Sequence, residues 1–574
     1  MPRMKVSDYI AQYLLECGID TVFGHLGGFN ADIIDSIYKT NQQRYVLGYH
    51  EQASSFAANA HSVLTEGVSV ATASGAPSAC NMIAGIANAF FDSNACLFLI
   101  GSVHSKAVKT AKEIRQNAFE EIDFVSVVSE ITKYAAKVNS PEDIRYHLEK
   151  AMYIAQNGRK GPAVLDIPYD VARADVCVED LKGFVSPVER VDRNMEIENV
   201  LTLLRKSKKP VILLGGGAKS HKSRTALRQL LEKVKIPSVA SLCGLDVLAH
   251  DHDCFSGFIG HYGNRYANFA IAHCDCLIVL GSRLDERQIA GKKSSFAPNA
   301  SIVHVDIDKI ELGRVLPETL SIHAKTEDFL QELTAGDFTG CDYSAWHNVL
   351  KVWKKRYPSY DLADTNVNVN TFFHIISDFL ADDAVICSDV GQTQMCVAQS
   401  LRLDKQRRLL NSAGYGSMGF SLPAAVGAAC VDAGRQIISV NGDGGVQMNI
   451  QELQTIKREN LPVTLIIVNN SCLGMIRRLQ ERLYDNRTVA SVEGYCAADY
   501  GAIAKAYGLP FVQITSPEQY ASLQEVLKDN SPKIVELVAC REMMNMPEPG
   551  PCIDMQTPLL SDDENMLINK ESLV

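Results

Sequence analysis

The sequence predicts an α/β protein with three doubly wound parallel-sheet domains. Short aliphatic and β-branched runs alternate with segments of helical periodicity along the 574 residues, which is typical of parallel strands covered by helices. With 46% hydrophobic residues, a chain of this length can bury several cores. Several strand-like runs end in polar, glycine-containing turns, as expected where an open sheet binds a ligand.

The first domain is predicted at residues 1–172. Its strand-like runs include "RYVLGYHE", "GVSVATASG", "ACLFLIG" and "GPAVLDIPYDV". An acidic stretch with proline at 174–192 is predicted to be a linker. The second domain, 190–340, contains "KKPVILLGGGA", "CDCLIVLGSRLDER" and "ASIVHVDID".

The third domain is predicted at 365–545, after a second linker at 352–368. It contains "AVICSDVGQ", "GYGSMGFSLPAAVGAA" and "LPVTLIIVNN". The C-terminal tail, 546–574, is polar and acidic, so we expect an arm or a partly disordered segment.

Charge and composition exclude several classes of function. The net charge of −11 is spread along the chain without a long basic run, which argues against nucleic acid and anionic membranes as partners. The N-terminus lacks the apolar core of a signal peptide, and the longest apolar runs have strand length. With no CxxC pair among the 16 cysteines, we expect reduced, mostly buried thiols in a cytoplasmic protein.

The segment "IISVNGDGGVQMNI", 437–450, predicts a strand that turns sharply into one helix. The next strand, "LPVTLIIV", ends at Asn470, so Asp443 and Asn470 are expected at the same carboxyl edge of adjacent parallel strands. Such oxygen ligands suit Mg²⁺, and Gly442, Gly444 and Gly445 would let backbone N–H groups approach a diphosphate. An ordinary Gly-Asp-Gly turn is the alternative reading.

The pair of motifs, Gly-Asp-Gly and then Asn-Asn 24 residues later, resembles the diphosphate motif of thiamine-diphosphate enzymes. The chain is further identified as similar to the acetolactate synthase branch by motifs in that family's order: "GHLGGFNADIIDSI", "HEQASSFAANA", "GIANAFFDS", "GRKGPAVLDIPYDV", "GSRLDERQIAG", "DVGQTQM", "GSMGFSLPAAVGAA" and "NLPVTLIIVNN". The resemblance covers nearly the whole chain. It implies that the three domains bind the pyrimidine, a flavin-type nucleotide and the diphosphate, in that order.

The resemblance assigns roles to individual residues. Glu51 corresponds to the glutamate that hydrogen-bonds the aminopyrimidine and so activates C2 of the thiazolium, and an apolar site is expected to raise its pKa. Met418 corresponds to the residue that holds the cofactor in its bent shape. Further cofactor contacts are implied for Gly28, Gly391, Gln392, Gln394 and Gly416. The implied metal ligands are Asp443, Asn470 and the backbone carbonyl of Cys472.

A second cofactor, FAD, is implied in the middle domain. The corresponding residues are Gly215, Gly216, Arg283 and Asp306. Because no GxGxxG fingerprint is present, this assignment rests on the resemblance alone. Middle domains of this superfamily also bind ADP or nothing.

Four departures from the family pattern surround the expected acceptor site. The chain has "GHLGG" for GYPGG, "FEE" for FQE, "SGAPSACN" for SGPGATN, and Leu479 where a tryptophan is usual. Phe119 and Arg287 remain at positions where the family lines the substrate channel. The added carboxylate of Glu120 would repel an acceptor carboxylate unless it is protonated or paired. Alternatively, Glu120 is a solvated or paired glutamate without effect on specificity.

The resemblance implies decarboxylation of a 2-oxo acid, with pyruvate as the expected donor, and carboligation of the activated aldehyde to a second carbonyl. With pyruvate as acceptor the product is 2-acetolactate. The alternatives are another acceptor (an aldehyde or a nucleotide-linked keto sugar), simple decarboxylation, a flavin oxidase of the pyruvate-oxidase kind, and a non-catalytic paralogue. Family enzymes share active sites across a homodimer or homotetramer, and some have a separate regulatory subunit.

Overall fold

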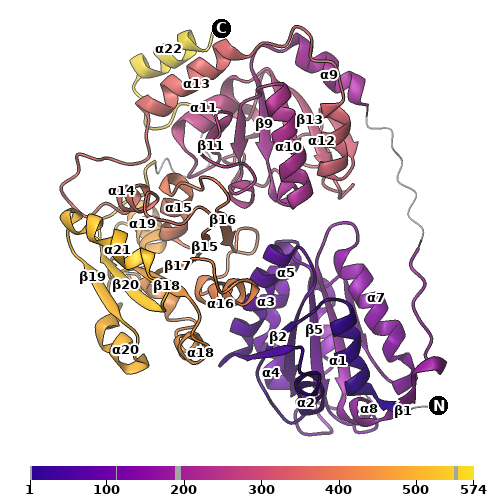
Figure 1. Ribbon diagram of the computed structural model, residues 1–574. Coiled ribbons are helices and arrows are strands. Elements are labelled where there is room, and N and C mark those ends of the chain that lie inside the picture. The colour runs from indigo at the N-terminus through magenta and orange to yellow at the C-terminus, as the bar shows by residue number, and fades with distance from the viewer. Residues whose placement is uncertain (1–2, 112, 188–195, 548–553) are drawn as a thin grey trace.

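The computed structural model describes residues 3–111, 113–187, 196–547 and 554–574 (Figure 1). It contains three parallel sheets of six strands each, with helices packed on them. The predicted fold class is therefore confirmed. The domain boundaries given above remain predictions.

The first sheet has the strand order β3-β2-β4-β5-β7-β6. Its strands are β2 (Thr21–Gly24), β3 (Arg44–Leu47), β4 (Ser69–Ser74), β5 (Cys96–Ser102), β6 (Tyr134–Lys137) and β7 (Pro162–Pro168). The main helices around it are α1 (Val6–Glu16), α2 (Ala31–Lys39), α3 (Glu51–Thr65), α4 (Gly75–Asn81), α5 (Ile83–Phe91) and α7 (Ile144–Gln156). Within the predicted linker at 174–192, β8 (Asp175–Cys177) pairs antiparallel with β1 (Arg3–Lys5), so this part is not an open linker.

The second sheet has the order β11-β10-β9-β12-β13-β14. Its strands are β9 (Pro210–Leu214), β10 (Ser238–Ala240), β11 (Phe255–Phe258), β12 (Cys276–Leu280), β13 (Ser301–Asp306) and β14 (Thr319–His323). The main helices are α9 (Ile197–Lys206), α10 (His221–Lys233), α11 (Arg265–His273), α12 (Thr326–Thr334) and α13 (Ser344–Arg356). Cys274 and Cys276 are buried among the aliphatic residues of this domain, as expected.

The third sheet has the order β16-β15-β17-β18-β20-β19. Its strands are β15 (Val385–Ser388), β16 (Arg408–Asn411), β17 (Ile437–Gly442), β18 (Val463–Asn469), β19 (Phe511–Ile514) and β20 (Lys533–Val538). The helices include α14 (Val369–Ile376), α15 (Gln392–Ser400), α16 (Ser421–Val431), α17 (Asp443–Val446), α18 (Glu452–Arg458), α19 (Gly474–Leu483), α20 (Tyr500–Tyr507) and α21 (Leu523–Lys528). The single helix expected after Gly445 is split into α17 and α18.

The first and third domains pack through α3 and α16 (Figure 1). Small side chains make this close approach possible: a Cβ at Gly427 would lie 2.1 Å from the carbonyl oxygen of Ala57. Phe56 and Phe420 meet edge to face at 5.5 Å between ring centroids. A continuous apolar core therefore fixes the helix that begins at Glu51 against the domain that contains Asp443.

The expectation for the C-terminal tail is wrong for residues 554–574. Helix α22 (Asp562–Glu571) packs beside α13 on the second domain (Figure 1). Met555 and Ile568 are fully buried there, and Trp353 Nε1 donates a hydrogen bond to Glu571 Oε2 at 2.8 Å. An acidic residue of the tail, Glu571, thus helps to hold it against the second domain. Throughout the ranges that the structure describes, every helix is too short or too polar to cross a membrane.

Candidate active site

Asp443 and Asn470 lie at the same edge of the third sheet, as the sequence predicts. The parallel register pairs Gly442 of β17 with Val468 of β18, so the residues that follow both strands emerge together. Asp443 begins the short helix α17 and is 2% exposed. A buried carboxylate at the carboxyl edge of a parallel sheet is a strong candidate for ligand contact.

The surroundings of Asp443 leave one of its oxygens free. Oδ1 accepts the N–H of Gly444 at 2.8 Å, whereas Oδ2 is buried and has no hydrogen-bond partner in the described part of the chain. Burial raises the pKa of Asp443 to about 6, although the nearby Tyr495 hydroxyl and backbone N–H groups oppose this shift. Since an unpaired buried carboxylate oxygen is costly, Oδ2 fits a site built for a hard cation.

Asn470 and Cys472 complete the predicted ligand set. Asn470 Oδ1 accepts the N–H of Cys472 at 3.3 Å, and its Nδ2 donates to Gln392 Oε1 at 3.4 Å. The thiol of Cys472 lies 3.8 Å from the carbonyl of Arg541. Gln392 therefore links the predicted ligand Asn470 to the first turn of α15.

The glycines of this region divide into two kinds. A Cβ at Gly445 would lie 1.9 Å from Oδ2 of the hydrogen-bonded Asp389, so packing demands glycine there. One at Gly444 would lie 2.5 Å from Leu473 Cδ2, the end of a side chain that would have to move. A Cβ at Gly442 would be 3.5 Å from Thr393 Oγ1, which is ordinary contact. Gly391 (φ +128°) has open space where a Cβ would be.

The remaining predicted contacts lie in neighbouring loops. Gly416 adopts φ +76° and also faces open space. A Cβ on Gly444 would be 3.9 Å from Met418 Cε, which places the Met418 side chain beside the Asp443 turn. Gln394 is buried and donates to the carbonyl of Ser412 at 3.4 Å. Gly28 lies apart, in the exposed turn between β2 and α2.

Glu51 begins α3 and is 8% exposed. Its Oε1 accepts a hydrogen bond from Ser78 Oγ at 2.7 Å, and its Oε2 accepts one from Asn81 Nδ2 at 2.9 Å. The prediction that the pKa of Glu51 is raised is wrong. Burial does act to raise the pKa, but these hydrogen bonds favour the carboxylate and lower the pKa below its usual value. Neither Ser78 nor Asn81 was recognised as a site residue from sequence.

Phe119 and Glu120 lie in a loop of the first domain. Phe119 is 81% exposed. Glu120 adopts φ +60°, and a Cβ on Gly75 would lie 2.1 Å from Glu120 Oε2. The structure does not place Arg287 with them: Arg287 lies in a cavity wall that neither residue lines, with its Nη2 3.7 Å from Met395 Sδ.

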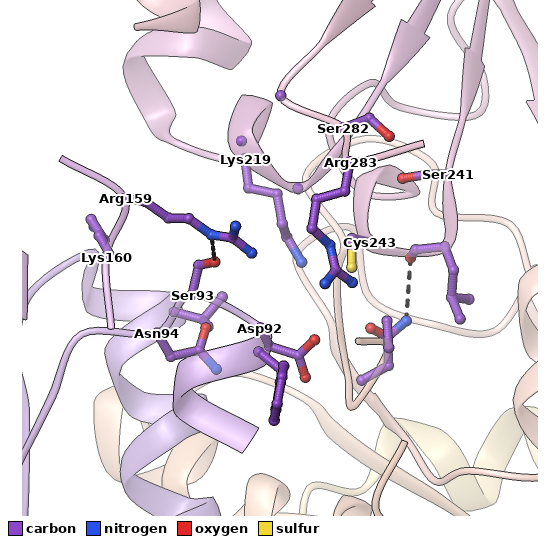
Figure 2. A pocket seen from close by; sticks show the side chains of 18 of the residues that line it. Asp92, Ser93, Asn94, Arg159, Lys160, Lys219, Ser241, Cys243, Ser282 and Arg283 are labelled. Carbon is purple, nitrogen blue, oxygen red and sulfur yellow. Dashed lines mark hydrogen bonds between the residues drawn. The ribbon is translucent and has the colours of Figure 1, made fainter. Parts of the chain in front are cut away.

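A cavity of about 390 Å³ lies where the three domains meet (Figure 2). Its size is that of an ordinary small-molecule pocket. Gly216, Arg283 and Asp306, three of the four residues that the resemblance assigns to a second cofactor, line it. Gly215 does not line it, and a Cβ there would be 2.2 Å from the carbonyl oxygen of Gly281. Burial raises the pKa of Asp306 at the end of β13.

The cavity is also lined by Lys219 and Asp92, two polar residues that sequence reasoning missed. Lys219 and Arg283 point into it, and Asp92 faces them from the end of α5 (Figure 2). Asp92 Oδ1 accepts the N–H of Gly414 at 2.6 Å, whereas its Oδ2 is buried and, within the described ranges, unpartnered. Burial raises its pKa to about 6 against the opposing effects of Gly414 and Arg283. A lone carboxylate inside "NAFFDSNACLFL" is the sequence signal that could have identified it.

Comparisons with known proteins match all three domains. The family described as thiamine pyrophosphate (TPP) enzyme matches with its N-terminal TPP-binding domain at 4–127, its central domain at 197–333 and its C-terminal TPP-binding domain at 389–537.

The chain is similar to acetolactate synthases along most of its length. The large subunit from Lactococcus lactis subsp. lactis is 31% identical over 547 residues, which cover 94% of this chain and 93% of that protein. The large subunit from Parasynechococcus marenigrum is 35% identical over 540 residues, 91% of this chain and 85% of that protein. The chloroplastic acetolactate synthase 1 of Oryza sativa subsp. japonica is 33% identical over 555 residues, 94% of this chain and 85% of that protein.

Proposed function

We propose, since the chain belongs to the acetolactate synthase family of thiamine pyrophosphate enzymes, that it decarboxylates pyruvate and joins the remaining acyl unit to a second carbonyl. The observation that best supports this proposal is Asp443 Oδ2, which lies at the same edge of the third sheet as Asn470 and is buried without a hydrogen-bond partner among the residues that the structure describes. With pyruvate as the acceptor, the product is 2-acetolactate.

The residues of the third domain would hold Mg²⁺ and the cofactor diphosphate. Asp443 and Asn470 would bind the cation by their side chains and Cys472 by its carbonyl, because Mg²⁺ prefers oxygen ligands. The open Gly391 and Gly416 backbones leave room for the cofactor, and Met418 would support it from the side of Gly444. Bound thiamine diphosphate supplies a thiazolium ring that accepts the electron pair released with CO₂.

Glu51 would exchange a proton with the ring nitrogen of the aminopyrimidine. Its hydrogen bonds come from Ser78 and Asn81 of its own domain, whereas the metal ligands lie in the third domain. In the family, these two parts meet over one cofactor across a subunit interface. We therefore propose at least a homodimer, with a homotetramer and a separate regulatory subunit as further possibilities.

The three-domain cavity would hold FAD. Lys219 and Arg283 offer positive charge to a pyrophosphate (Figure 2). Asp306, at a strand end, offers a carboxylate to the hydroxyl groups of a ribose. Net redox by this flavin is not part of the proposed carboligation.

A different acceptor is a second candidate, which the position of Glu120 favours. Its carboxylate lies beside Gly75 at the start of α4. Ser78 of the same helix donates a hydrogen bond to Glu51. An ionised Glu120 near the acceptor would disfavour a second 2-oxo acid and would tolerate a neutral aldehyde or the keto group of a nucleotide-linked sugar.

The test is to assay purified protein with thiamine diphosphate, Mg²⁺, FAD and pyruvate, and to measure CO₂ and acetolactate together. Equal amounts of both, lost in Glu51→Gln, are expected. CO₂ without acetolactate would favour the second acceptor, which added aldehyde or keto-sugar nucleotide would then reveal. Stoichiometric O₂ or quinone consumption would indicate an oxidase, and no CO₂ would contradict pyruvate as donor.

A further inference from the structure

Both oxygens of Glu51 are held by one short segment, 74–81, which is also where the sequence departs from the family pattern. Ser78 Oγ lies 2.7 Å from Oε1, and Asn81 Nδ2 lies 2.9 Å from Oε2. Ser78 and Asn81 are three residues apart in α4, so they project from one face of that helix. Both side chains therefore meet the carboxylate that begins α3.

The direction of each hydrogen bond follows from its surroundings. Ser78 Oγ accepts the backbone N–H of Ser74 at 3.1 Å, which orients the hydroxyl so that its single proton points to Glu51 Oε1. An ionised carboxylate only accepts hydrogen bonds, so the amide of Asn81 presents its N–H group rather than its oxygen. Two donors are thus directed at Glu51, and each carboxylate oxygen keeps a lone pair for another partner.

The backbone turn before α4 places these donors. The chain leaves β4 at Ser74 and enters α4 through Gly75, whose φ of +69° is in the left-handed region that favours glycine. Glu120 accepts the N–H of Ala76 at 3.1 Å through its backbone carbonyl. This contact fixes the first turn of α4 from the other side.

We propose that Ser78 and Asn81 are positioning residues that hold Glu51 as an oriented carboxylate and thereby shift the proton it shares with the cofactor onto the aminopyrimidine nitrogen. The inference rests on the proposed function for the role of Glu51. In the step concerned, the O–H bond of protonated Glu51 breaks and an N–H bond forms at the ring nitrogen. The carboxylate that remains gains both hydrogen bonds at full strength, because bonds to an ionised acceptor are stronger than bonds to a neutral one.

The other titratable groups near Glu51 come from neighbouring elements. His25 follows β2 and favours the carboxylate by its charge when protonated. Tyr45 of β3 interacts with Glu51, and its own pKa is raised mainly by burial. Glu452 of α18 accepts the N–H groups of Tyr49 and His50 just before Glu51. None of these groups replaces the two direct donors.

The test uses the holoenzyme with thiamine diphosphate and Mg²⁺ and without substrate, so that it does not depend on turnover. Deuterium exchange at C2 of the bound cofactor is measured by acid quench and NMR. A hydrogen bond to a charged group contributes enough that Ser78→Ala should slow exchange about tenfold to a hundredfold. Ser78→Thr keeps a hydroxyl and should exchange at the wild-type rate. The control is Ser129→Ala, because the Ser129 hydroxyl donates to a local backbone carbonyl, that of Ser126, at 3.1 Å. This control should also exchange at the wild-type rate.

A second measurement separates positioning from general damage. The pH midpoint of the ultraviolet or circular-dichroism change of the bound aminopyrimidine should fall in Ser78→Ala, since a less stabilised carboxylate reclaims the proton from the ring. If Ser78→Ala lowers the melting temperature, Ser78→Cys keeps the side-chain size with a weaker donor and gives the same comparison.

The outcomes are distinguishable. Fast exchange in the wild type with the same rate and midpoint in the Ser78 variants would overturn this inference and leave the proposed function standing. Wild-type exchange no faster than that of free thiamine diphosphate would overturn both.

Discussion

Arg408 Nε lies 2.7 Å from Asp246 Oδ2, which joins the third domain to the second by a buried ion pair. Lys219 Nζ lies 3.1 Å from Asp246 Oδ1, and Lys219 also borders the three-domain cavity (Figure 2). Burial opposes ionisation of Asp246, yet the charges of Lys219 and Arg408 lower its pKa well below the usual range. One carboxylate thus pairs with two cations at the domain junction, and the three groups together keep one net positive charge.

Asp246→Asn should destabilise the protein strongly, because it leaves the buried Arg408 and the half-buried Lys219 without a counter-charge. Breaking a buried pair in this way typically costs about 3–5 kcal/mol of unfolding free energy, which urea unfolding can measure. The matched control is Lys39→Ala, which removes an exposed ion pair with Asp35 and should change stability little. Equal effects of the two changes would contradict the assigned importance of Asp246.

The pH dependence of stability should reveal Asp92. Its pKa is raised to about 6 by burial, whereas an unfolded aspartate titrates near about 3.9. The native state therefore binds more protons than the unfolded state between these values, so the contribution of Asp92 to stability is lost as pH rises through this window.

Asp92→Asn should flatten that part of the curve. The asparagine can keep the hydrogen bond from Gly414 through its oxygen and needs no charge at the buried second position. Above pH 6 the variant should be more stable by about 3 kcal/mol, which is the free-energy equivalent of the difference between the two pKa values. The measurement is the urea midpoint of the apoprotein of both forms across the window, and parallel curves would show that Asp92 does not titrate there.

The sequence predicts the Asp443 turn well because strand, turn and next strand are close along the chain, and parallel register follows from their alternation. It does not predict that Ser78 and Asn81 contact Glu51, because that contact depends on how α4 packs against α3. The direction of the Glu51 pKa shift was wrong for the same reason: burial could be anticipated, but its two donors could not. For the tail, the polar composition predicts an arm or partial disorder, but two apolar residues, Met555 and Ile568, are buried and hold its end against the second domain.

Gly445→Ala and Gly442→Ala should separate packing from cofactor binding. A Cβ at Gly445 would overlap Asp389 Oδ2, and Asp389 is itself buried and held by the N–H groups of Gly419 and Phe420. The melting temperature of the apoprotein should therefore fall clearly in Gly445→Ala. It should change little in Gly442→Ala, which meets only ordinary contact. Any loss of thiamine-diphosphate affinity in Gly442→Ala would then report on the cofactor and not on folding.

Asp443→Asn should change stability and metal binding in opposite directions. Within the described part of the chain, Oδ2 of Asp443 is a buried carboxylate oxygen without a hydrogen-bond partner, so replacing the charge by a neutral amide should stabilise the apoprotein. The same change removes the anionic ligand from the proposed Mg²⁺ site, and substitutions even of outer partners of metal ligands cost about 10–100-fold in affinity or activity. Thermal unfolding with and without Mg²⁺ and thiamine diphosphate measures both effects. The expected result is a higher melting temperature for the apo variant and no further rise on adding the ligands, whereas the wild type should be stabilised by them. A variant that still gains stability from Mg²⁺ and thiamine diphosphate as the wild type does would remove Asp443 from the metal site.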